Sequence, residues 1–95
     1  VIECEVSFLM SQYEFSLQQE VLMEKGASVL GDLFRYQQKN KNSDSAQSIS
    51  VLYSLIWSAK QDILVAKSES DLDRIEGQFT LADQFLNEIK VGANA

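Results

Sequence analysis

Four carboxylates are the residues of this sequence that could carry out chemistry. Glu20 and Glu24 are four residues apart, and Asp73 and Glu76 are three residues apart, so each pair would share one face of a helix. Two facing helices that each contribute such a pair could bind Mg²⁺, because this ion prefers carboxylate oxygens. The spacing therefore defines one candidate metal site, provided that the two helices face each other.

The rest of the sequence argues against most enzyme chemistry. The chain contains no histidine, which removes the usual general base and the histidine-activated nucleophiles. Cys4 lies between Glu3 and Glu5, whose negative charge disfavours a reactive thiolate. Among 14 acidic residues, pairs at helical spacing arise by chance. We predict a protein that is not an enzyme and has no catalytic, cofactor or metal site, with an Mg²⁺-dependent all-α nucleotide hydrolase as an alternative.

Composition bounds the fold class. The 95 residues, 45% of them hydrophobic, suffice for a single domain over residues 1–95 with one core. There is no proline and there are only four glycines, whereas a β-sandwich or barrel needs turn residues every few positions. The composition therefore predicts an all-α protein.

Charge and cysteine content restrict the partners. A net charge of −6 argues against direct binding of nucleic acid or an anionic membrane surface, and it permits a basic protein partner. The single Cys4 cannot form an internal disulfide, and no apolar run approaches the length of a membrane-spanning helix. These features predict a cytoplasmic protein without membrane contact.

The apolar pattern predicts three helices, over about residues 5–39, 45–67 and 70–91. The last two helices form an antiparallel hairpin, because only a short connection separates them. Alternating residues within 1–8 also allow a strand, but no second strand is available to pair with it. We therefore predict a three-helix bundle with a long N-terminal helix.

The helix over 45–67 is apolar around about two-thirds of its circumference, so it needs neighbours on two sides. Val51 and Leu55 widen its apolar stripe on one side, and Trp57 and Leu64 widen it on the other. The helix over 70–91 has a single seam with alternating spacings of three and four. The seam consists of Leu72, Ile75, Phe79, Ala82, Leu86 and Ile89.

Polar and small residues predict the helix ends. Asp44, with Gln47 as its partner, is expected to cap the second helix, and Ser70 the third. Gly92 is expected to end the third helix. The glycines at 26 and 31 fall inside the first helix, where they indicate a kink, a close helix crossing or a tolerated weak point.

The first helix carries more apolar surface than the other two helices can cover. This surplus predicts a homodimer, unless the helix kinks and wraps its own core. The predicted interface consists of Val6, Leu9, Met10, Tyr13, Phe15, Leu17 and Trp57.

No motif in the sequence identifies a family. We predict a small acidic protein-protein interaction module, acting as a regulator, adaptor or chaperone in the form of a homodimer. Acidic residues concentrate in the last third of the chain, which would suit a basic partner. An inhibitor that mimics nucleic acid through Asp71, Asp73 and Glu76 is a second alternative.

Overall fold

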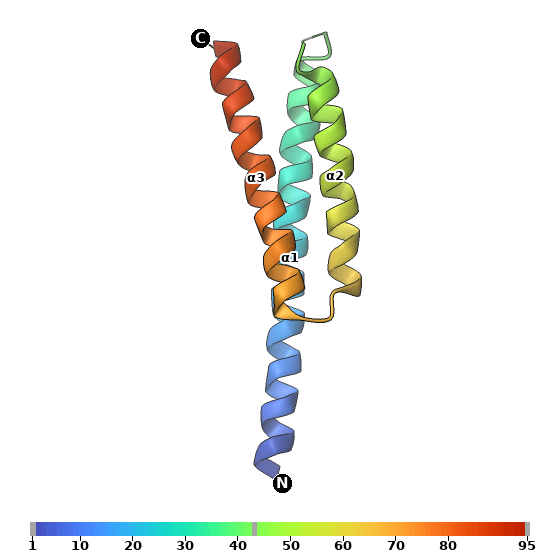
Figure 1. Cartoon of the computed structure of the whole chain (residues 1–95), viewed down its shortest axis with the longest axis vertical. Helices are drawn as coiled ribbons and strands as arrows, with labels where there is room; N and C mark the ends of the chain where they lie inside the picture. Colours follow the sequence, from blue (N-terminus) through green and yellow to red (C-terminus); the bar gives the residue numbers. More distant parts are fainter. Residues whose placement is uncertain (1, 43, 95) are drawn as a thin grey trace.

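The computed structural model of the protein describes residues 2–42 and 44–94. This part of the chain forms three helices and no strand: α1 spans Ile2–Lys39, α2 spans Ala46–Val65, and α3 spans Glu69–Asn94. Figure 1 shows α2 and α3 running in opposite directions, with α1 packed along both. The predicted all-α fold with a long N-terminal helix and an α2–α3 hairpin is confirmed.

The core lies where the three helices meet. The seam predicted for α3 is buried from Leu72 to Leu86, and Ile89 packs against its edge. The α2 stripe buries Ile49, Ile56 and Ile63, with Leu52 and Tyr53 half-buried beside them. The buried core residues of α1 are Leu22, Val29, Leu30 and Leu33. Each helix therefore turns one apolar face inward, as a bundle requires.

The first third of α1 extends past the end of the bundle. Because α1 begins at Ile2, the alternative that the first eight residues form a strand is wrong from Ile2 onward. Val1 lies outside the described residues. Among the α1 residues whose burial is described, the first buried one is Leu22, and Phe15 is half-buried before it. Figure 1 shows the N-terminal end of α1 projecting beyond the α2–α3 connection. The molecule is consequently long and thin, with extents of 62 × 21 × 17 Å.

Gly26 allows α3 to approach α1 closely. A Cβ atom at Gly26 would lie 2.9 Å from Cζ of Phe79, whereas a Cβ at Gly31 would meet only the Arg35 guanidinium, at 3.4 Å. The helix α1 continues unbroken through both glycines. The close-crossing interpretation is therefore confirmed for Gly26 and wrong for Gly31, and α1 does not break at either position.

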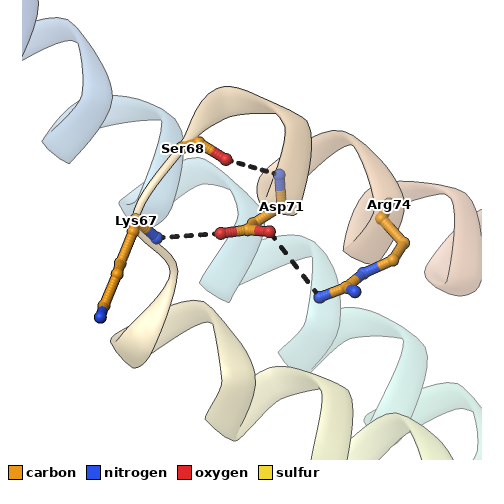
Figure 2. Close-up of polar contacts among 4 residues, drawn as sticks. All are labelled: Lys67, Ser68, Asp71 and Arg74. Carbon is orange, nitrogen blue, oxygen red and sulfur yellow. Dashed lines mark hydrogen bonds and ion pairs between the residues drawn. The ribbon is translucent and has the colours of Figure 1, made fainter.

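The helix ends differ from the predicted ones. Figure 2 shows that Ser68 caps α3: the N–H of Asp71 donates to its Oγ at 3.3 Å, and the N–H of Lys67 donates to the Asp71 carboxylate at 3.1 Å. This arrangement is a capping box in which the returning donor is the N–H of Lys67, one residue before the cap, and the cap Ser68 lies two residues before the predicted one, Ser70. The predicted caps were chosen by residue type, and Ser68 and Ser70 both satisfy that rule.

Two further predicted ends are wrong for related reasons. Ser45, not Asp44, occupies the N-cap position of α2, and its side chain makes no cap hydrogen bond. The helix α3 continues past Gly92 to Asn94. A glycine stops a helix only where the backbone takes a positive φ angle, and none of the described glycines does so.

Because the capping box uses an ionised carboxylate, the stability of the fold should fall as the solution becomes acidic, and Asp71→Asn tests this. The Lys67 N–H, assisted by Ser68 and Arg74 against a smaller effect of burial, lowers the pKa of Asp71 below its ordinary 3.8. A lowered folded-state pKa stabilises the fold above the unfolded-state pKa, and this contribution disappears as the pH falls through the folded-state value. We expect the variant to melt at a lower temperature than the parent at pH 7.

Thermal melts at pH 7 and at about pH 3 test this expectation, because the difference between variant and parent should be smaller at the lower pH. Asp83→Asn, at an exposed position of the same helix, serves as the control and should leave the melt unchanged at pH 7. If Asp71→Asn lowered the melting temperature equally at both pH values, the loss of stability would not come from the ionised carboxylate of Asp71.

Candidate interaction surfaces

The four carboxylates of the candidate metal site do not come together. Glu76 faces α1 but pairs with Lys25, whose Nζ lies 3.5 Å from its carboxylate and also donates to Thr80 Oγ1 at 3.1 Å. Within residues 2–42 and 44–94, no group of three or more His, Cys, Asp or Glu side chains could hold a metal ion. The arrangement gives the Mg²⁺-dependent hydrolase no support. Glu76 also belongs to the acidic surface that the nucleic-acid mimic would use, and there its charge is paired with Lys25.

An apolar stripe runs along the projecting part of α1 and continues past Phe15 into the bundle. We call it the α1 stripe, and it consists of Val6, Leu9, Met10, Tyr13, Leu17 and Val21. All six side chains are exposed, from Leu17 at 40% to Val21 at 64%. Helical periodicity places them about half a turn away from the line of Phe15, Leu22 and Leu33, which faces the bundle. The stripe therefore points away from the core over most of its length, and at its end Leu17 and Val21 border a hollow against Glu69 and Leu72 of α3.

Five of the seven predicted interface residues belong to the α1 stripe, and two do not. Phe15 is half-buried against the core, so it contributes to packing within the bundle. Trp57 is 53% exposed halfway along α2, separate from the projecting end of α1. The predicted residues thus divide into five members of the α1 stripe, one residue packed on the core and one exposed tryptophan on α2. Whether any of them contacts a second copy stays a prediction.

A second apolar surface lies between α2 and α3. We call it the α2–α3 face, and its exposed members are Val51, Leu55, Leu81 and Phe85. Leu55, Leu81 and Phe85 border an apolar groove of about 470 Å³, whose floor includes the buried Ile56 and Ala82. A shallower hollow continues the groove toward Gln47 and Val51. This face is separate from the α1 stripe.

Sequence reasoning missed this second surface as a functional feature. It treated Val51 and Leu55 as residues that a neighbouring helix would cover, although α1 and α3 leave both exposed. It also left Leu81 out of the α3 pattern. The available signal was a second series on α3 with spacings of four, three, four and three, formed by Arg74, Gln78, Leu81, Phe85 and Glu88.

Both surfaces suit contact with protein. None of the three helices, over the residues described, combines the length and the hydrophobicity that crossing a membrane requires. Contiguous exposed apolar patches on small proteins commonly mark sites of association. The molecule thus offers two apolar helical surfaces and, among its described residues, no cluster of His, Cys, Asp or Glu side chains that could hold a metal ion.

Comparison with known proteins agrees with this description. No curated protein sequence and no solved structure matches the chain. Residues 11–89 match the family described as bacterial epsilon antitoxin. The match takes in most of α1, all of α2 and α3 as far as Ile89, which includes every buried residue of the core. Because it covers far more than half of the sequence, the protein belongs to the bacterial epsilon antitoxin family.

Proposed function

We propose that this protein is an antitoxin that binds a toxin protein and keeps it inactive, and that the α1 stripe is its contact surface. Membership in an antitoxin family points to a regulatory protein with a protein partner rather than to an enzyme. The predicted protein-protein interaction module is supported at that level. The cytoplasmic location and the specific partner belong to the proposal.

The observation that carries the proposal is the exposure of the α1 stripe. Its six apolar side chains lie on one face of a helix, and four of them precede the half-buried Phe15. The four residues before Phe15 lie beyond the bundle, whereas Leu17 and Val21 border a hollow against the start of α3 and remain exposed there. A helix that presents apolar residues at spacings of three and four is the usual ligand of an apolar groove in a partner protein.

The charges along α1 indicate which side chains the toxin's groove should carry. Residues 1–24 contain five acidic side chains and no lysine or arginine. Glu20 and Glu24 continue the same face as the α1 stripe, beyond Val21. A toxin surface that fits this helix should be apolar along the groove and basic at one end. Opposite charges of this kind raise the association rate, and salt weakens the effect.

The test begins with the protein itself as bait in a lysate of its native host. A captured protein whose expression alone arrests growth, and whose effect co-expression of this chain reverses, would be the toxin. The contact surface is then tested with Leu9→Ala/Tyr13→Ala, because interface anchors of this type typically contribute 2 kcal/mol or more each. We expect the double variant to bind the captured toxin at least about 100-fold more weakly and to lose protection.

Phe8→Ala provides a matched control for the double variant. Phe8 is 63% exposed, as Tyr13 is, but it lies on the opposite side of the same helix. We expect Phe8→Ala to protect like the parent and all variants to keep the parental melting transition. Protection by Leu9→Ala/Tyr13→Ala at the parental level would rule out the α1 stripe as the contact surface. Failure to reverse any growth arrest would rule out the antitoxin function.

A further inference from the structure

A hollow lies where α1 enters the bundle and α3 begins (Figure 1). We call it the α1–α3 hollow, and its volume is about 340 Å³. Leu17 and Val21, the last two members of the α1 stripe, line it from α1, and Glu69 and Asp73 line it from α3. It shares no lining residue with the groove of the α2–α3 face. The hollow therefore continues the α1 stripe onto a second helix.

The floor of the α1–α3 hollow is apolar. Leu22 and Leu72, which are 5% and 4% exposed, belong to the core and form this floor. Leu17 and Val21 lie beside them and remain exposed. A hollow of this size suits the aliphatic part of a long side chain rather than a whole helix. A partner side chain that removes this apolar surface from water stabilises the complex.

Negative charge surrounds this floor. Glu69, Asp73 and Glu76 line the hollow, and Lys25 is the basic residue among its lining side chains. Lys25 is already engaged, because its Nζ lies 3.5 Å from the Glu76 carboxylate and donates to Thr80 Oγ1. Over the residues that the structure describes, neither Glu69 nor Asp73 forms an ion pair. Two carboxylates of the hollow are therefore without a cation.

The start of α3 does not cancel this charge. A helix N-terminus carries only about half a positive charge, whereas Glu69 and Asp73 each carry a full negative one. Lys67, which precedes α3, lines a different hollow beside Phe8. The α1–α3 hollow therefore stays negative in the isolated chain.

An apolar floor below negative charge matches lysine and arginine. Both side chains have an aliphatic stem that packs on apolar surface and a charged end group that stays at the polar edge. An apolar occupant would cover the two carboxylates without pairing them, which costs free energy. A small cation would leave the floor uncovered. The occupant that fits both features is a basic side chain, presented by a protein that also covers the α1 stripe.

We propose that the α1–α3 hollow binds a lysine or arginine side chain of the toxin. The aliphatic stem of this side chain packs on Leu17 and Val21, and its charged group pairs with Glu69 and Asp73. This inference rests on the proposed function, because it assigns the basic residue to the toxin that the α1 stripe contacts. The toxin then contacts two helices at once, so a related toxin without the basic residue binds less tightly.

Calorimetric titration with the toxin captured from the host lysate tests the inference. Glu69→Gln/Asp73→Asn should bind that toxin about tenfold or more weakly at low salt, and its difference from the parent should shrink as salt is added. Asp62→Asn/Asp83→Asn is the matched control, since it changes the net charge equally at exposed positions outside the hollow. We expect the control to bind like the parent and both variants to keep the parental melting transition.

A double-mutant cycle then identifies the basic residue of the toxin. Lysines and arginines of the toxin are replaced by alanine one at a time, and one replacement should weaken binding to the parent but not to Glu69→Gln/Asp73→Asn. Parental affinity of Glu69→Gln/Asp73→Asn overturns the inference, as does an equal loss in the control or a cycle without coupling. The antitoxin function stands in each of these cases, because the parent still reverses the growth arrest. A parent that reverses no growth arrest removes the proposed function, and this inference with it.

Discussion

Replacing Phe79 with alanine should lower the free energy of unfolding by about 3–5 kcal/mol. The Phe79 side chain is 0% exposed and lies at the crossing of α3 with α1, against Gly26. Its removal leaves a cavity that the glycine cannot fill. Because small domains are stable by only about 5–15 kcal/mol, this loss removes a large share of the stability of the fold.

Chemical denaturation monitored by circular dichroism measures this loss, provided that the slope of the transition stays constant. Phe8→Ala is the control, because Phe8 is 63% exposed beyond the end of the bundle and should change the free energy by no more than about 0.5 kcal/mol. Equal losses for the two phenylalanines would show that α3 does not pack on α1 as described.

The second large effect concerns the glycine that faces Phe79. The new methyl group of Gly26→Ala would lie 2.9 Å from a ring that cannot move aside in the packed core, and this overpacking should cost about 1–3 kcal/mol of the free energy of unfolding. This cost outweighs the gain of about 1 kcal/mol that alanine usually brings to a helix interior.

Gly31→Ala is the matched substitution, one and a half turns further along the same helix. Its methyl group would meet only the exposed Arg35 guanidinium at 3.4 Å, so the gain in helix propensity should dominate. We expect Gly31→Ala to raise the midpoint of the same denaturation transition and Gly26→Ala to lower it. Shifts of the same sign would refute the assignment of Gly26 as the crossing point.

Periodicity was enough to predict the inward faces of the helices. The α3 seam from Leu72 to Leu86 and the α2 stripe through Ile49, Ile56 and Ile63 are buried as their spacing required. Their burial could be predicted because the inward face of a helix follows from the spacing of apolar residues within that helix alone. The fold class and the order of helices follow from the same local information.

The remaining features depend on how the helices are placed in space. The sequence could not distinguish Gly26 from Gly31, because only the position of Phe79 on another helix separates them. It could not show that Val51 and Leu55 remain uncovered, since both look like core residues on a helical wheel. Ser68 and Ser70 are equivalent caps until the turn between the helices is known.

The projecting end of α1 lies outside the cooperative unit of the protein. Its residues before Phe15 make few contacts that would be lost when the core unfolds, and isolated helical segments of this length are marginal in water. Heating should therefore unwind this end gradually before the bundle melts, as a sloping decline of ellipticity ahead of the main transition. A partner protein that binds this end would remove the sloping decline of ellipticity and leave the melting temperature of the core unchanged.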